Sequence, residues 1–142
     1  MKSAKKGHTH IILIERGEKV IEKLTEYCRE HKITAGFLTG IGAVDEAEIA
    51  HYIVDNKEYS STTLSEPMEI ANMTGNVATM DGEPYLHCHI TLGKKDFTLA
   101  GGHLKEARVH AVCEVYLVQV KRKLERAKDE RIGLNVWKDL KG

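Results

Sequence analysis

The sequence predicts an α+β fold, with a mainly antiparallel, strongly bent sheet of about seven to nine strands and one long amphipathic helix packed on it. Three observations predict this fold. Short alternating segments follow one another along most of the chain, and turn residues such as Gly, Asp and Asn separate them. Only one segment, from about Glu18 to His31, repeats its apolar residues every three or four positions. A single domain, residues 1–142, is expected from this length.

The predicted strands are apolar or alternate between apolar and polar residues. They comprise residues 10–15, 33–44, 47–54, 58–64, 68–79, 85–92, 97–103 and 109–120. The charged stretch after residue 120 is expected to be a solvated turn or a short helix. Trp137 is expected to tie down the C-terminal part of the chain.

Two of these segments have additional features. Residues 33–44 contain Gly36, Gly40 and Gly42, which match neither the phosphate-loop nor the dinucleotide-binding pattern. We interpret them as glycines at bulges or close contacts. In residues 109–120 both alternating faces are mainly apolar, so both should be covered. The helix covers one face, and another copy of the chain or the far wall of a barrel-like sheet is expected to cover the second.

Charge and composition argue against a uniformly basic DNA-binding protein, a membrane-spanning protein and a disulfide-linked protein. The 21 Lys and Arg residues balance the 21 Asp and Glu residues, so DNA binding would need local basic patches. The apolar runs are too short to cross a membrane, and the three cysteines are widely spaced, which predicts a cytoplasmic protein with reduced thiols. The locally basic residues are Lys2, Lys5, Lys6, Lys94, Lys95, Lys121, Arg122 and Lys123.

The segment from Tyr85 to Leu92 has the strongest functional signal. Its alternation places His87 and His89 on one face of a strand, and Cys88 with the apolar residues on the other. The two histidines are therefore expected to face a polar surface or cavity rather than the core. A third histidine, His103, follows on the predicted return strand.

The register of this hairpin decides whether His103 joins the other two histidines. A four-residue loop, residues 93–96, pairs His89 with Ala100 and turns His103 to the opposite face. A three-residue loop, or a bulge at the glycine pair 101–102, places His103 on the same face. The sequence leaves both arrangements open.

If the three imidazoles converge, they form a candidate metal site. Neutral imidazoles are good ligands for zinc and related divalent ions, and three of them leave a coordination position open for water. The predicted metal ligands are His87, His89 and His103, and the predicted cofactor is a divalent metal, with zinc the first choice. His51 and Glu114 are candidate supporting groups.

Other titratable residues are weaker candidates for a catalytic or metal-binding role. Glu83 and Glu106 border the hairpin and are candidate catalytic bases, although no hydrolase motif accompanies them. His8, His10 and His31 lie in or near polar stretches that look exposed, and we assign them no role.

Three stretches of the chain resemble the plants-and-prokaryotes conserved (PPC) domain, which in plants follows AT-hook motifs. They are EPMEIANMTGNVATMDGEPYLHCHITLG, AGGHLKEARVHAVCEVYLVQV and LERAKDERIGLNVW. The most specific parts are GNV at Gly75 to Val77, the histidine pair and GGHL at Gly101 to Leu104. The resemblance implies an α+β fold, a homotrimer, an association with DNA, and a metal held by the histidines at positions 87, 89 and 103. The sequence has no Arg-Gly-Arg-Pro core of an AT-hook.

These observations favour a trimeric DNA-binding or regulatory protein with a three-histidine metal site. A trimer would triplicate each local basic patch and so enlarge a surface for DNA. One alternative is a metal-dependent enzyme, a hydrolase or lyase of unknown substrate. The other is a trimeric scaffold or small-ligand-binding module.

Overall fold

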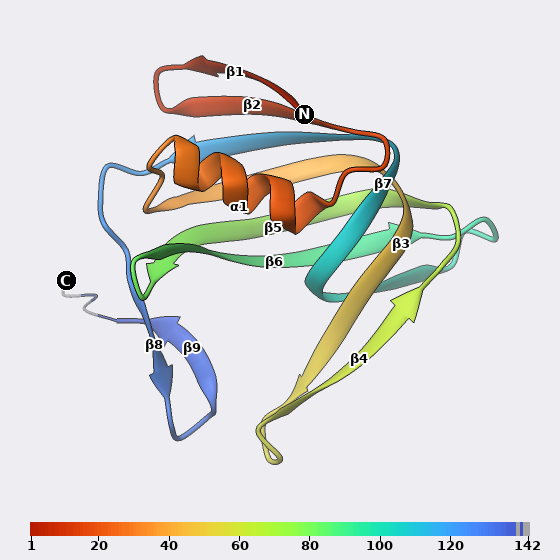
Figure 1. Cartoon of the computed structure of the whole chain (residues 1–142). Helices are drawn as coiled ribbons and strands as arrows, with labels where there is room; N and C mark the ends of the chain where they lie inside the picture. The colour runs from red at the N-terminus through yellow and green to blue at the C-terminus, as the bar shows by residue number, and fades with distance from the viewer. Residues whose placement is uncertain (139, 141–142) are drawn as a thin grey trace.

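The computed structural model describes residues 1–138 and 140, so residues 139, 141 and 142 of the expected domain lie outside the description. Its elements are β1 (Lys2–Lys6), β2 (Thr9–Glu15), α1 (Val20–Glu30), β3 (Gly36–Ile53), β4 (Glu58–Leu64), β5 (Met68–Met80), β6 (Glu83–Gly93), β7 (Leu99–Gln119), β8 (Arg126–Asp129) and β9 (Leu134–Trp137). Seven strands form one sheet in the order β1-β2-β7-β6-β5-β3-β4, and β8 and β9 form a second sheet (Figure 1). The predicted α+β class and mainly antiparallel sheet are confirmed.

The helix is shorter than the sequence predicted. It has 11 residues, and its apolar stripe is buried against the sheet. The expectation of a long helix was therefore wrong. The side chain of Glu106 on β7 accepts hydrogen bonds from the backbone N–H groups of Ile21 and Glu22 at 2.8 and 3.1 Å. Because these N–H groups have no partner within the helix, a residue from a distant strand defines where α1 begins.

Four strands close into a ring of pairings. β3 pairs with β5, β5 with β6, β6 with β7, and β7 again with β3. The predicted strands at 33–44 and 47–54 are one bent strand, β3, because pairing with β7 continues through Glu46 and Arg108 with register shifts. The helix covers one side of the bent sheet, and the β3–β4 hairpin extends from the other side (Figure 1).

Close packing accounts for the glycines in β3. At Gly42 the φ angle is +152°, and a Cβ atom would lie 2.1 Å from the carbonyl oxygen of Val112 on β7. A side chain there would separate the two strands that hold the bend together. The interpretation of these glycines as close contacts rather than a nucleotide loop is consistent with this geometry.

The second face of residues 109–120 is exposed in the described chain. Val112 and Tyr116 are 41% and 54% exposed, whereas Val115 and Leu117 on the other face are buried. The neighbouring strands β2 and β3 add more exposed apolar residues. We refer to this surface as the apolar outer face; it consists of Ile11, Phe37, Ile41, Val112 and Tyr116.

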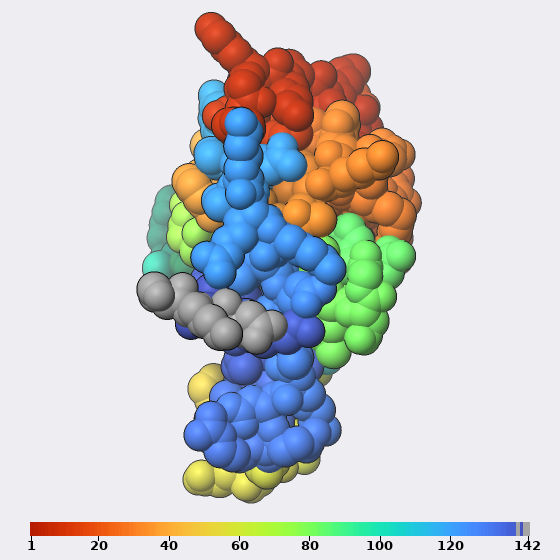
Figure 2. All heavy atoms as spheres, turned by 90° about the vertical axis from the view of Figure 1, so that its left-hand side faces the viewer, coloured from red at the N-terminus to blue at the C-terminus, as the bar shows by residue number. Residues whose placement is uncertain are grey.

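The C-terminal charged stretch is a hairpin; residues 130–133 form the expected turn, whereas the expected short helix is replaced by two strands. β8 and β9 pair antiparallel and lie against the β3–β4 hairpin (Figure 2). The Tyr52 hydroxyl donates to the carbonyl of Ile132 at 2.6 Å, and the Lys57 ammonium donates to the carbonyl of Glu130 at 2.7 Å. These two bonds attach the tip of one hairpin to the other.

Two further sequence expectations concern the cysteines and the membrane. Cys28, Cys88 and Cys113 are all buried and unpaired, as expected for small core residues. Within the described residues, no helix has the length and apolar character needed to cross a membrane.

Candidate metal centre

The β6–β7 hairpin places His103 directly opposite His89. β6 ends at Gly93 and β7 begins at Leu99, so the loop is residues 94–98, longer than the three- and four-residue loops that the sequence suggested. The two strands pair here without a register shift, so the expected bulge at the glycine pair 101–102 is absent from the β6–β7 pairing. Loop length alone brings His103 to the face of His89, because adding one residue to a four-residue loop changes the phase of the return strand.

The glycine pair has a different role from the one expected. A Cβ atom on Gly102 would lie 2.7 Å from the carbonyl oxygen of Ala50 on β3. A side chain at this position would push β3 away from β7, next to His103. The glycine therefore lets β3 approach the site.

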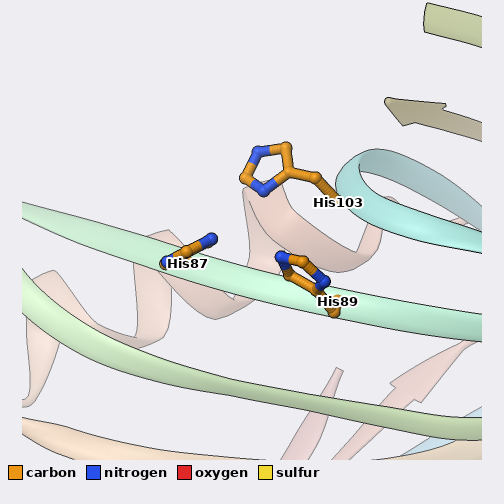
Figure 3. A group of neighbouring side chains, drawn as sticks. All are labelled: His87, His89 and His103. Carbon is orange, nitrogen blue, oxygen red and sulfur yellow. The ribbon is translucent and has the colours of Figure 1, made fainter. Parts of the chain in front are cut away.

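Three imidazoles converge in this region (Figure 3). His87 and His89 extend from β6 and His103 from β7, and one ring nitrogen from each lies within 4.8 Å of the other two. The ring centroids are 5.1 to 5.7 Å apart. Two nitrogens bound to one zinc ion are at most about 4 Å apart, so modest side-chain rotations would suffice to share an ion.

The surroundings keep at least two of these rings neutral. Burial, followed by the charges of Arg126 and His103, lowers the pKa of His87 to about 4. Burial, followed by the charge of His89, also lowers the pKa of His103. Its Nδ1 atom is enclosed and has no hydrogen-bond partner among the described residues. A neutral imidazole with a free nitrogen is the form that binds metal.

Sequence reasoning missed Arg126, which lies next to the histidines. It is 7% exposed, and its Nη1 donates to the carbonyl of Asn135 at 2.6 Å. Its Nη2 donates to Asn76 Oδ1 at 2.8 Å and lies 3.4 Å from His87 Nδ1. The guanidinium lies 5.1 Å from the centre of the Tyr85 ring. The only available signal was a turn-forming DERIG segment followed by the alternating LNVW, which marks a hairpin but does not show that an arginine points inward.

The histidines and Arg126 line a cavity of about 430 Å³. β3, β4, β6, β7 and the β8–β9 hairpin all contribute to its wall. No Asp or Glu is among the described residues that line it. Its aromatic and aliphatic lining residues are Tyr52, Tyr59, Tyr85, Leu134 and Val136.

The other candidate residues have separate positions. His51 is exposed and is among the residues that line the cavity. Glu114 instead lies on the side of β7 with the apolar outer face, between Leu13 and Ile41, and does not line the cavity. Glu106 caps α1, and Glu83 is bonded to Arg29 at 2.9 Å, so neither expected base reaches the cavity.

The expectation that His10 lies in an exposed stretch was wrong. Its side chain is fully buried, with Nδ1 3.0 Å from the hydroxyl of Tyr27 on α1.

Comparison with known proteins identifies the family. The sequence matches the Plants and Prokaryotes Conserved (PCC, also written PPC) domain over residues 1–121. The chain belongs to this family. No curated protein matches the chain.

Solved structures share the complete PPC fold. A putative DNA-binding protein from Bacteroides thetaiotaomicron is 32% identical, with 96% of this chain and 95% of that chain covered and a TM-score of 0.93. A metal-containing protein from Archaeoglobus fulgidus is 35% identical, with 95% and 96% covered and a TM-score of 0.89. A PPC protein from Pyrococcus horikoshii is 32% identical, with 95% and 94% covered and a TM-score of 0.88. The family match ends at residue 121, before the hairpin that carries Arg126.

Proposed function

We propose that this PPC protein binds a divalent transition metal, zinc foremost, through His87, His89 and His103. The observation that carries the proposal is the convergence of three imidazole nitrogens within 4.8 Å of one another at the wall of a cavity. The metal-containing relative from Archaeoglobus fulgidus supports it. When bound, the ion would supply a Lewis-acidic position for water or a ligand oxygen.

Zinc titration of the purified metal-free protein tests this proposal. We expect one zinc ion per chain, and His103→Ala should weaken zinc binding by more than the roughly 10- to 100-fold that loss of a supporting partner causes. His8→Ala is the matched control, because His8 lies in the turn between β1 and β2. Equal zinc affinity in wild type and His103→Ala would refute the site.

We propose further that three copies of the chain assemble through the apolar outer face. Its residues are 41% to 57% exposed and lie on the paired strands β2, β7 and β3 around Glu114, and exposed apolar residues gathered in this way are typical of an interface. Light scattering should give three times the mass of one chain. Tyr116→Asp should shift the mass to one chain, whereas Phe97→Asp, at an exposed loop outside the patch, should not.

DNA binding is a second candidate function, supported by the relative from Bacteroides thetaiotaomicron. Lys5 and Lys6 are exposed on the edge strand β1, and neither has an ion-pair partner among residues 1–138 and 140. Each phosphate contact should add about 0.9 to the slope of log affinity against log salt concentration. An affinity for duplex DNA that does not change with salt concentration would exclude this function. The double variant Lys5→Gln, Lys6→Gln should reduce the slope more than Lys32→Gln does.

A metal-dependent hydrolase or lyase is the alternative function. The cavity beside the histidines favours it, but both carboxylates expected to act as a base lie elsewhere. Proton transfer in such an enzyme would depend on His51, Tyr59, Tyr85 or a metal-bound water.

A further inference from the structure

Arg126 is a buried cation without a buried anion. No carboxylate lies within ion-pair distance of its guanidinium among the residues the structure describes, and none lines the cavity. Its acceptors are an amide oxygen, a backbone carbonyl and an imidazole nitrogen, all of them neutral. Burying a charge is costly unless an opposite charge compensates it, so the cavity lacks a negative group.

A metal ion would increase this imbalance. Three neutral imidazoles add no negative charge, so a divalent ion beside Arg126 would give the cavity three positive charges and no fixed carboxylate to balance them. A bound anion is the remaining source of compensation. Water can solvate this charge but cannot neutralise it.

Metal binding would also free a donor on Arg126. Arginine has only donors, so in the 3.4 Å contact the Nδ1 of His87 is the acceptor. A neutral imidazole has one lone pair, which either accepts from Arg126 or binds a metal. Metal binding by His87 therefore releases an Nη2 N–H of Arg126. Of the five N–H groups of the guanidinium, three would then have no acceptor among the residues that the structure describes, including Nε–H, which already has none there.

The wall of the cavity indicates the kind of anion. Tyr59 packs against His103 with ring centroids 5.3 Å apart, and Tyr52 lies 4.8 Å from Tyr59. Leu134 and Val136 of β9 complete an apolar side. A phosphate ion would need polar donors around all its oxygens, whereas one arginine, one metal and an apolar wall suit a carboxylate with a hydrocarbon or aromatic body.

We infer that the cavity binds a small organic carboxylate whose negative charge lies between Arg126 and the three-histidine metal site. The inference rests on the proposed metal function. It also gives the β8–β9 hairpin a role, because this hairpin brings Arg126 to the cavity.

The test uses the full chain, loaded with zinc, and 4-fluorobenzoate as the probe. Its neutral analogue 4-fluorobenzamide has nearly the same shape and no charge. We expect the carboxylate to bind at least about tenfold more tightly, the effect of one charge-assisted hydrogen bond. Fluorine NMR measures both dissociation constants. Trp137, the one tryptophan of the sequence, lies 5.7 Å from the Arg126 guanidinium and gives an independent fluorescence signal.

Arg126→Gln should remove most of the preference for the carboxylate, and Lys128→Gln, an exposed change on the same strand, should preserve it. Arg126→Lys keeps the charge and should retain part of the preference, which separates loss of charge from loss of hairpin structure. Equal binding of the two probes, an unchanged preference in Arg126→Gln, or tighter binding of inorganic phosphate than of the carboxylate would overturn the inference. Zinc uptake is measured before any probe is added: failure to bind zinc refutes both proposals, whereas zinc binding without a carboxylate preference refutes only this one.

Discussion

Two groups of histidines lie on opposite sides of the sheet, and their ring geometries are similar. His10 of β2 and His31, the residue after α1, lie around Tyr27 of α1, with ring centroids 4.1 to 5.7 Å apart. The three imidazoles of the candidate metal centre are 5.1 to 5.7 Å apart. The first group is packed against the core, with His10 fully buried and bonded to the Tyr27 hydroxyl. The second lines a cavity beside an uncompensated arginine.

This difference shows that clustering alone does not define a binding site. Free volume and a buried arginine without a counter-charge distinguish the second cluster, because a ligand needs both space and partners. An unpaired nitrogen does not distinguish it, since His10 Nε2 in the first cluster also has no hydrogen-bond partner among the described residues. The first cluster contributes packing and a buried hydrogen bond, so changes there should alter stability and leave metal binding unaffected. Mutations in each cluster test whether metal binding and stability are separate in this way.

Zinc should stabilise the protein only through His87, His89 and His103, the three histidines that line the cavity. At a free zinc concentration about 1,000 times its Kd, the free energy of unfolding should rise by about 4 kcal/mol. His89→Ala should abolish this increase, and His31→Ala should retain it. Urea denaturation with and without zinc measures the difference. An increase that survives in His89→Ala would place the metal elsewhere.

The Tyr27 hydroxyl should matter for stability alone. Tyr27→Phe leaves Nδ1 of His10 buried without a partner, which should cost about 1 to 3 kcal/mol of unfolding free energy. Zinc stoichiometry should not change. Loss of zinc binding in Tyr27→Phe would show that the two clusters are coupled.

Buried His10 should also make the free energy of unfolding depend on pH. Burial lowers the pKa of His10 below its usual 6.5, so below pH 6.5 the unfolded chain takes up a proton that the folded protein does not. The contribution of His10 is therefore complete above pH 6.5 and is lost as the pH falls toward the lowered pKa. The slope is at most about 1.4 kcal/mol per pH unit for one group.

His10→Gln should reduce the slope of unfolding free energy against pH in the metal-free protein, and His8→Gln should not. Urea denaturation at pH 7, 6 and 5 gives the slopes. Identical slopes for wild type and His10→Gln would show that His10 does not stay neutral in the fold.

The smallest expected effect concerns the attachment of the hairpin that covers the cavity. Tyr52→Phe removes the 2.6 Å bond to the carbonyl of Ile132 and should cost about 0.5 to 1.5 kcal/mol. Hydrogen exchange should accelerate at residues 126–137 and stay unchanged in α1. Tyr59→Phe, on the same wall, is the control for removing a hydroxyl. Faster exchange across the whole chain would instead mean that this bond stabilises the entire fold.

The sequence predicted the strands between residues 10 and 120 and the histidine face well, because both depend on local alternation, but it missed β1, β8 and β9. From Tyr85 to Leu92 a two-residue period is enough to separate His87 and His89 from Cys88, and the structure has this arrangement. It predicted the helix less well. Periodicity indicated Glu18 to His31, but the helix starts at Val20, where Glu106 from β7 caps it.

The side of the sheet on which His103 lies could not be derived from the sequence. Loops of three, four or five residues would all fit between β6 and β7. Each change of one residue in loop length moves His103 to the opposite face of the sheet. Arg126 was missed for a related reason. Its strand has four residues, too few to show a period, and its inward orientation depends on contacts with Asn76 and Asn135.

Short-range patterns along the chain were sufficient to predict the fold class, the family and the shared face of His87 and His89. Tertiary structure alone decided that a third histidine, a buried arginine and an acid-free cavity meet at one place. These groups come from β6, β7 and β8, and their meeting depends on loop length and on the packing of one hairpin against another. Such long-range geometry has no periodic signature along the chain.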